Sequence, residues 1–527
     1  MVLPATVQAV IAARLDRLAL DDKRLLQMAA VIGAEGPGPL LRAVSDLSDE
    51  AFGRAMARLH TGEFLLPLRV VPEPVHRFKH ALTHEVVYGS LLRQDRRELH
   101  LRVLRAMERS QGTKAAQRAT ESPVEMLAFH AARAEDWEAA ADYGRKAGLR
   151  AAARSANREA IGHYSRALDA LRRLPDGPDR AAAEADLNIE IRNALFIIGE
   201  HDAIPSRLEE AARIAEGVGD KPRQMRAGLL LSGWYWQSAK HRLAAAAADS
   251  AMAIASTGEG DLTTALGLYR RGTILQAVGA YREAVKVLRE AIALLDRRGE
   301  QDAFAFGGYP FVFCHSFLAW SLAELGEDAA ARDEGARGWA AAAQLGNSYS
   351  QAVMSFGHGH ALIRAGTLAE AEAVLERGLE LYRVVEVPAT YPWIAAGLGY
   401  VRVMRGDTER GLALLRQAVM PEVRARGPMY AHTYLRLAEA THHLGLSGEA
   451  LAAARAGREA AEAQEERGHL AWAGRVLGDV LSAEAPREAG SHYRQAADIA
   501  EELGMRPEVE LVAAGLAKMK GRARRMG

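Results

Sequence analysis

The sequence feature that most constrains the fold is a chain reversal that recurs about every 40 residues. It is plainest in the segment VGAYREA, residues 278–284, where a glycine separates two stretches of helical periodicity. Successive copies lie 40, 40, 47, 40, 40, 39 and 40 residues apart. The residues at the turn are Gly199, Ala239, Gly279, Gly326, Gly366, Gly406, Gly445 and Ala485. A period of this length predicts an array of repeats rather than one globular core.

Small side chains recur at fixed distances from each turn. Seven residues before it stand Ser232, Gly272, Ala319, Gly359, Gly399 and Ala438. Five after it stand Ile204, Ala244, Ala284, Ala331, Ala371, Gly411 and Ala450, and Ala489 stands four after the last. Twelve after it stand Ala211, Ala251, Ala291, Gly338, Gly378, Ala418 and Gly457, and Ala496 stands eleven after the last. This spacing predicts paired helices whose axes approach to about 8–10 Å, in hairpins that must stack to bury their apolar faces.

The repeat pattern resembles that of the tetratricopeptide repeat family. Members of that family carry small residues at these offsets and an aromatic residue two positions after the turn, as Tyr281 is here. The copies in this chain are longer than the usual 34 residues, and most lack the terminal proline of the family. The resemblance implies an all-α, tetratricopeptide-like, right-handed helical-repeat solenoid whose superhelical pitch departs from that of the family.

Composition places the chain among ordinary water-soluble proteins. It has 527 residues, of which 49% are hydrophobic and 25% charged, and Lys plus Arg balance Asp plus Glu at 67 each. This balance excludes a global attraction to nucleic acid or acidic lipid. Cys314 is the single cysteine, so an intrachain disulfide framework and a multi-cysteine zinc site are also excluded. With no signal peptide and no apolar run long enough to span a membrane, we expect a cytoplasmic protein.

The N-terminal region does not follow the repeat register. Helical periodicity covers residues 5–18, 21–32, 40–44 and 49–59, and strand-like segments follow at 64–71 and 75–79. Helices followed by a small hairpin predict a winged-helix domain. The segment from Phe78 to about Ser110 is predicted to be helical, and the polar segment from Gln111 to Pro123 is predicted to be a linker.

Several strings, taken in order, resemble a family of bacterial signalling ATPases. They are VQAVIAARLDRL, KRLLQMAAVIG, FKHALTHEVVY, DWEAAADYGRKAG, NREAIGHYSRALDAL and CHSFLAWSLAELG. The likeness is to the region after the nucleotide-binding domain of AAA/STAND-type ATPases, which are often fused to class III adenylate or guanylate cyclase domains. It implies the following domains: winged-helix-like 1–79, connecting helices and linker 80–123, capping hairpins 124–182, repeat solenoid 183–504, and capping helix with basic tail 505–527.

The motifs that would carry the chemistry of that family are absent from this sequence. A phosphate-binding loop needs Gly-Lys, and the sequence contains no such dipeptide. We find no cyclase motif either, so we predict a non-enzymatic chain without a cofactor. His80 and His84 lie one helical turn apart, but Tyr88 stands where a zinc protease helix would need its second histidine. The pairs at 358–360 and 442–443 do not share a helix face, so we predict no metal site.

A winged helix also raises the possibility of DNA binding. The helix around Leu40 to Leu47 offers only Arg42, and Asp46, Asp49 and Glu50 flank it. Phosphate contacts need Lys and Arg, so we consider nucleic acid an improbable partner. The basic tail at Lys518, Lys520, Arg522, Arg524 and Arg525 is predicted to be solvated.

Aromatic residues recur at the positions that line the concave face of tetratricopeptide arrays. The predicted partner-binding groove consists of Trp236, Tyr269, Phe313, Trp320, Phe356, His360, Trp393 and Tyr400. His432 and His442 continue the same surface. Two interpretations remain open, because the rings could line a groove for a protein or peptide, or longer helices could rotate them into the core between hairpins.

Taken together, the sequence favours a protein-interaction and sensor scaffold, the regulatory repeat half of a signalling ATPase or adenylate cyclase-like protein. One alternative is a truncated or split ATPase or cyclase component that acts with an upstream nucleotide-binding domain. A second alternative is a winged-helix transcription regulator, which would bind DNA with a steep dependence on salt.

Overall fold

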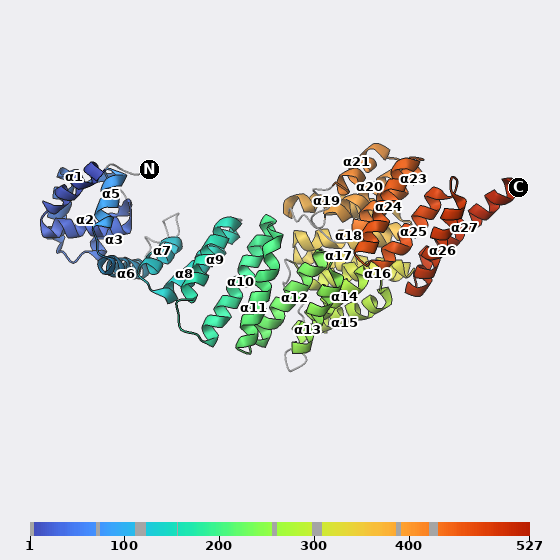
Figure 1. Cartoon of the computed structure of the whole chain (residues 1–527), viewed down its shortest axis with the longest axis horizontal. Coiled ribbons are helices and arrows are strands. Elements are labelled where there is room, and N and C mark those ends of the chain that lie inside the picture. The colour runs from blue at the N-terminus through green and yellow to red at the C-terminus, as the bar shows by residue number, and fades with distance from the viewer. Residues whose placement is uncertain are drawn as a thin grey trace. The chain divides into compact units, whose positions relative to one another are not determined.

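The structure is a computed structural model of the chain and describes residues 5–69, 74–110, 123–154, 156–255, 261–297, 308–385, 391–420 and 430–526. The chain divides into two compact units, Met1–Ala203 and Ile204–Gly527. The fold is all-α apart from one small sheet, and helices follow one another along both units (Figure 1). None of the helices that the structure describes combines the length and the apolar character needed to cross a lipid bilayer.

The first unit begins with helices around a small antiparallel sheet. Its elements are α1 (Ala5–Asp16), α2 (Leu20–Ile32), β1 (Glu35–Pro37), α3 (Gly38–Val44), α4 (Asp49–Thr61), β2 (Leu65–Arg69), β3 (Val75–Phe78), α5 (Ala81–Gly89) and α6 (Arg93–Ser110). The described strands form a sheet in the order β1-β3-β2. The side chain of Ser48 caps α4 by accepting a hydrogen bond from the amide of Ala51.

Two details of this region differ from the sequence-based expectation. The short strand β1 lies between the helices expected at 21–32 and 40–44, where no strand was predicted, and it pairs with β3 from Glu35 to Pro37. The segment predicted as one helix after Phe78 is two helices, α5 and α6, because the chain turns at residues 90–92. The polar linker expected at 111–123 lies outside the described residues except for Pro123, which begins the next helix.

Helical hairpins complete the first unit. They consist of α7 (Pro123–Arg133), α8 (Trp137–Ala153), α9 (Asn157–Leu171), α10 (Pro178–Ile198) and the short 3-10 helix η1 (His201–Ala203). Gly148 of α8 faces the ring of Tyr164 on α9, and a Cβ atom at that position would overlap the ring. A small residue is therefore required where these two helices meet.

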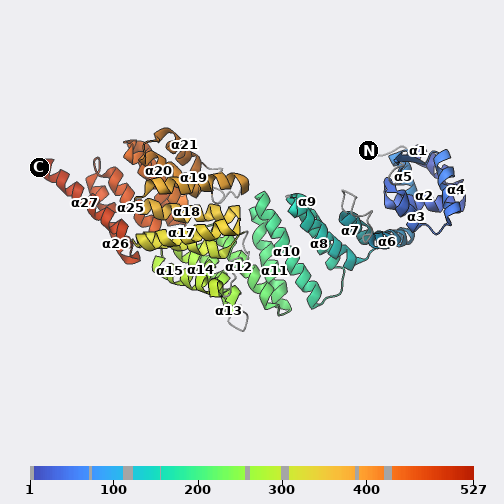
Figure 2. The ribbon, with the colours of Figure 1, turned by 180° about the vertical axis from the view of Figure 1, so that it is seen from behind.

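The second unit is the main repeat array. Its helices are α11 (Ile204–Gly217), α12 (Lys221–Gln237), α13 (His241–Ala255), α14 (Asp261–Ala277), α15 (Tyr281–Arg297), α16 (Pro310–Glu324), α17 (Asp328–Leu345), α18 (Ser348–Arg364), α19 (Leu368–Val385), α20 (Tyr391–Met404), α21 (Thr408–Ala418), α23 (Tyr430–His443), α24 (Ser447–Ala463), α25 (Arg467–Leu481), α26 (Pro486–Leu503) and α27 (Arg506–Met526). In the view from behind, α15, α17 and α19, each the second helix of its hairpin, follow one another along the array (Figure 2). The predicted C-terminal helix is α27, and Val512 is its most buried apolar side chain.

The structure confirms the turn register. Seven of the eight marker residues adopt a left-handed backbone conformation, with φ between 56° at Ala239 and 96° at Gly406. Glycine adopts this conformation without steric cost, which is why it dominates these positions. Ala485 differs, with φ of −134°, because the last turn is one residue shorter and Ala485 precedes α26 as its N-cap.

The columns of small residues lie where helix axes cross. Gly399 of α20 and Gly411 of α21 face each other, seven residues before and five after the turn at Gly406. A Cβ atom at Gly399 would lie 2.8 Å from the carbonyl oxygen of Gly411, closer than real Cβ contacts. The backbones of this hairpin therefore meet almost directly, as the spacing predicted.

Candidate functional site

The predicted aromatic residues converge on the inner side of the second unit. They come from the first helix of successive hairpins, which are α12, α14, α16, α18 and α20. The ring of Trp236 meets those of Phe317 and Trp393 edge-on at 5.7 and 6.2 Å between centroids. Trp320 meets Phe356 at 4.5 Å between ring centroids. The structure thus brings the predicted set together in one cluster.

These rings are buried between hairpins and do not line an open groove, which agrees with the second of the two interpretations that the sequence left open. Trp320 is 1% exposed, and Trp236, Tyr269, Phe313, Phe356, His360 and Trp393 are also buried. Only Tyr400 among the eight is half-buried. The physical reason is that the superhelix is tight, so inner helices of hairpins two to four steps apart bring their rings into contact, as Trp236 does with Phe317 and Trp393. These large side chains fill the space between the helices. Whether these residues bind a partner stays a prediction.

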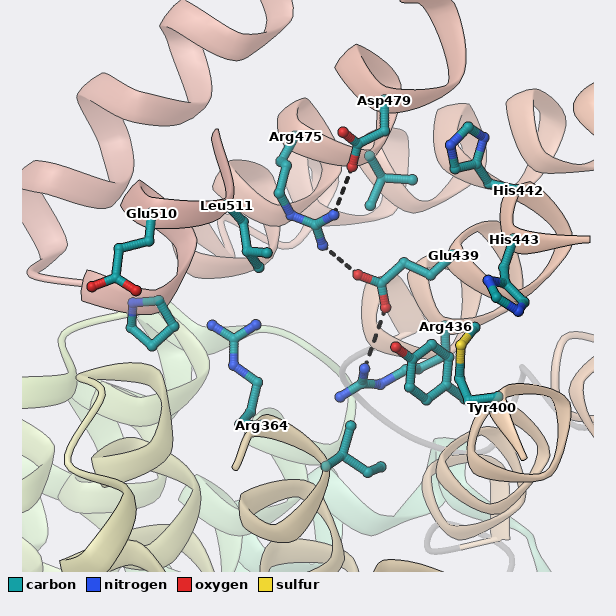
Figure 3. A pocket seen from close by; sticks show the side chains of 14 residues that line it. Arg364, Tyr400, Arg436, Glu439, His442, His443, Arg475, Asp479, Glu510 and Leu511 are labelled. Atoms are coloured by element: carbon teal, nitrogen blue, oxygen red, sulfur yellow. Dashed lines mark hydrogen bonds and ion pairs between the residues drawn. The ribbon is translucent and has the colours of Figure 1, made fainter. Parts of the chain in front are cut away.

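A cavity of about 560 Å³ lies beside this aromatic cluster, on the same inner side. Its walls come from α18, α20, α23, α25 and α27 (Figure 3). The charged residues that line it are Arg364, Arg436, Glu439, Arg475, Asp479 and Glu510. The apolar residues that line it are Ile363, Met404, Val476, Pro507 and Leu511. A concave site of this size with a few fixed polar groups is typical of a ligand-binding pocket.

Arg475 is the centre of the ion-pair network in the wall of the cavity. Its Nε donates to Glu508 at 2.5 Å and its Nη1 donates to Asp479 at 2.8 Å. Its Nη2 donates to Glu439, which also accepts from the indole of Trp472 at 2.8 Å. Arg475 therefore ties the fully buried Glu508 to the half-buried Glu439 and Asp479, and charge-assisted bonds of this kind fix side-chain positions strongly.

Arg436 forms the opposite wall. Its guanidinium lies between the rings of Tyr400 and Trp472, at 4.6 and 4.7 Å from their centroids. It donates to Glu439 at 3.3 Å and to Nδ1 of His360 at 3.3 Å. The side chain is held by aromatic faces and by hydrogen bonds together, so the cavity presents a preorganised cation.

A histidine and a glutamate link the cavity wall to the aromatic cluster. Nε2 of His360 donates to Glu324 at 2.7 Å, and the indole of Trp320 donates to the same carboxylate at 3.2 Å. Burial lowers the pKa of His360 to about 4, because the charged imidazole would lose its hydration. Burial alone would raise the pKa of Glu324, but Arg364 and His360 hold it well below its usual range. The pair is therefore a neutral imidazole beside a charged carboxylate at neutral pH.

Arg364 projects from the end of α18 towards the cavity (Figure 3). Its Nη1 donates to Glu508 of α27 at 3.3 Å, and its Nη2 lies 3.3 Å from Glu324. Burial disfavours the charge, but these two carboxylates still raise the pKa of Arg364. Both signs of charge are thus fixed around the cavity, and neither sign dominates its wall.

The histidines weighed as metal ligands serve other roles. His84 bonds through Nε2 to the carbonyl oxygen of Ala30 at 2.9 Å, and His80 is exposed. His442 and His443 line the cavity but are exposed to solvent. Across the part of the chain that the structure describes, no group of three or more His, Cys, Asp or Glu residues is placed to hold a metal ion.

The helices beside the small sheet offer few cations for DNA. Arg42 of α3 pairs with Asp49 at 2.6 Å, and Arg54 of α4 pairs with Glu50 at 3.3 Å. Arg58 donates two hydrogen bonds to the buried Asp22 at 2.7 and 2.8 Å. Each of these three arginines therefore has a carboxylate partner.

The charged residues of the cavity were not predicted from the sequence. Arg436 and Arg475 lie in helices rich in small, apolar and aromatic residues, as in the segment LAWAGRVLGDV, residues 470–480. An arginine within such a segment is a usable signal, because burying it requires a carboxylate partner. The partner Glu508 lies 33 residues further on, and nothing in the repeat register connects the two.

No protein-family model matches the sequence. An uncharacterized protein of Rhizobium meliloti (strain 1021) is 32% identical over 163 residues, which are 31% of this chain and 15% of that protein. The crystal structure of a Rap protein complexed with competence and sporulation factor superposes with a TM-score of 0.51 at 12% identity, covering 69% of this chain and 98% of that one. A STAND protein with a tetratricopeptide repeat sensor from Pyrococcus horikoshii gives a TM-score of 0.32 at 12% identity, covering 99% and 66%. The likeness to the Rap protein shows a shared helical-repeat fold.

Proposed function

We propose that this chain is a non-enzymatic interaction scaffold that binds a protein or peptide segment in the cavity of its repeat array. The observation that carries the proposal is the cavity itself, which is lined by five helices and by charges held in place through buried ion pairs. Such a site offers fixed hydrogen-bonding groups next to apolar side chains, which is what a peptide with polar backbone and mixed side chains requires.

The charge pattern favours a peptide over a strongly ionic small molecule. Three arginines line the cavity, and three carboxylates line it with them. A phosphate group would approach Glu439, Asp479 and Glu510, and a polyamine would approach the arginines, so each would meet like charges. A peptide can offer carbonyl oxygens, amides and apolar groups at once, and Leu511 and Met404 provide apolar contacts at the wall.

The fold supports the proposal by analogy. The Rap protein with a shared fold was solved in complex with competence and sporulation factor. A shared fold does not transfer a ligand, so this analogy supports only the general idea that such an array binds a regulatory partner. The identity of the partner must come from the site of this chain.

A finer proposal concerns the protein in which this chain acts. We propose that it is the regulatory repeat half of a cytoplasmic signal-transduction ATPase or cyclase-like protein, with a winged-helix-like domain at 1–79 and the solenoid at 183–504. The resemblance of sequence strings such as KRLLQMAAVIG supports this proposal. The order α2, β1, α3, α4, β2, β3 is the order expected of a winged helix, which also supports it. ATP hydrolysis would then belong to another domain or chain.

The experiment is a selection of random linear peptides on the whole immobilised chain, followed by affinity measurement on variants. Leu511→Trp should block the mouth of the cavity, because Leu511 lines it and is 45% exposed. Leu446→Trp is the matched control, since Leu446 is 40% exposed and does not line the cavity. We expect selected peptides to bind the wild type and Leu446→Trp with equal affinity and to lose their affinity for Leu511→Trp.

Two results would contradict the proposed function. One is that the wild-type chain retains no peptide family above background. The other is that peptides bind Leu511→Trp as tightly as the wild type, which would place their site elsewhere. Titration with Mg-ATP provides a separate check on the non-enzymatic assignment, and micromolar binding of ATP would argue against it.

A further inference from the structure

The last helices of the second unit pack against turns from its first repeats. Arg242, at the start of α13, pairs with Glu465 just before α25 at 2.6 Å, although 223 residues separate them. Arg506 of α27 donates through Nε to the carbonyl oxygen of Leu325, in the turn after α16, at 2.8 Å. We call this junction of α25–α27 with the turns after α12, α14 and α16 the closing contact.

Backbones meet at the middle of the closing contact. A Cβ atom at Gly279, in the turn after α14, would lie 2.8 Å from the amide nitrogen of Gly468 in α25. A Cβ atom at Gly468 would overlap the hydroxyl of Tyr281, whose side chain is buried. No side chain larger than hydrogen fits at Gly468 unless the two segments separate. The closing contact is therefore tightly packed, and it is sensitive to the size of the side chain at position 468.

A buried carboxylate fixes the same junction. Glu466 is fully buried and accepts from Nε2 of His241 at 3.3 Å and from Nδ1 of His469 at 2.7 Å. His241 begins α13 directly after the early turn, whereas Glu466 is the N-cap residue of α25 and His469 lies in the first turn of that helix. A buried carboxylate needs such donors, so separation of the two segments would expose the Glu466 carboxylate to water or leave it without the hydrogen bond from His241.

The closing contact shares residues and helices with the cavity. One wall of the cavity comes from α18, α20 and α23, and the other comes from α25 and α27. The ion pair of Arg364 with Glu508 joins α18 to α27 across it, and Pro507 contacts the turn at Gly326. If the closing contact opens, α27 leaves α16 and α18, and the cavity loses the wall that holds Pro507 and Leu511.

We infer that occupation of the cavity and the closing contact are thermodynamically coupled, so that a peptide touching both walls holds the superhelix closed. The inference rests on the proposed function and adds its regulation. Coupling of this kind is reciprocal. If the peptide binds the closed arrangement more tightly than the open one by a given factor, a substitution that opens the closing contact lowers the affinity for the peptide by up to that factor. The change between the closed and open arrangements would then transmit partner binding to the effector that the chain regulates.

The experiment uses the full chain and a peptide selected on the wild type. Cysteines replace Arg242 and Glu465, whose side chains meet at the exposed edge of the closing contact, and both carry fluorescent dyes. The native Cys314 is buried and stays unlabelled. Gly468→Val opens the contact by the overlap with Tyr281, and Gly448→Val is the control because nothing lies within 4 Å of a Cβ there. Glu466→Gln is a second opening variant that leaves the size unchanged.

We expect Gly468→Val and Glu466→Gln to lower energy transfer between the dyes, and saturating peptide to restore it. Their affinity for the peptide should fall by about tenfold, within the range usual for coupled sites, while Gly448→Val matches the wild type. Equal peptide affinity in the wild type and in an opened variant would overturn the inference, and so would unchanged transfer in both opening variants. Failure of the wild type to retain any peptide would instead refute the proposed function.

Discussion

Substitution of Gly399 by valine tests the register that organises the second unit. A Cβ at Gly399 would lie 2.8 Å from the carbonyl oxygen of Gly411 and 2.8 Å from Cγ of Leu415. Ordinary contacts begin near 3.4 Å, so α20 and α21 would have to separate by about 0.6 Å, the difference between the two distances. Overpacking of this kind costs roughly 1–3 kcal/mol. The better helix propensity of valine over glycine returns only a few tenths of a kcal/mol.

We therefore expect Gly399→Val to lower the free energy of unfolding by about 1–3 kcal/mol. Urea unfolding followed by circular dichroism measures it, with the slope of the transition compared as well as its midpoint, since an array can unfold in parts. Gly448→Val is the matched control, because that position is open. If both variants unfold at the same urea concentration as the wild type, the helix axes do not meet at Gly399 and the register is wrong.

Three further predictions follow from burial. Arg475→Leu should cost about 3 kcal/mol in urea unfolding, the lower end of the range for a broken buried pair, because Glu439 and Glu508 each lose one of their two arginine partners; unchanged stability would contradict the network. Trp320→Ala should cost about 3–5 kcal/mol, since the ring is buried, whereas a ring on an open groove would cost little. The melting temperature should fall as pH drops from 6.5 towards 4, because the unfolded chain protonates His360 in that window and the folded chain does not. His360→Gln should reduce this fall. If the melting temperature of His360→Gln depends on pH as steeply as that of the wild type, the lowered pKa of His360 is contradicted.

The repeat register could be predicted because each turn needs a local conformation. Gly279 and Gly406 adopt positive φ, and that requirement is written into the sequence as glycine. The small residues at Gly399 and Ala371 are likewise buried where the columns placed them. Local backbone geometry and helix pairing depend on neighbours in sequence, so one chain suffices to detect them.

The functional surface could be predicted only in part, because it depends on how tightly the superhelix winds. The positions of Trp320 and Trp393 on the inner side follow from the register, but their burial also depends on contacts between hairpins far apart in sequence, since Trp393 meets Trp236 and Trp320 meets His432. The cavity depends on Arg364 meeting Glu508 across 144 residues. Small rotations per repeat accumulate into such contacts, and no periodic pattern specifies them.

Hydrogen exchange of the full chain, with and without a selected peptide, reports whether a peptide binds in the cavity on the inner side of the repeat array. We expect saturating peptide to slow exchange in the segments of α18, α20, α23, α25 and α27 that line the cavity, while exchange in α4 and α9 stays unchanged. Slower exchange confined to segments outside these five helices, with none at the cavity, would contradict binding in the cavity.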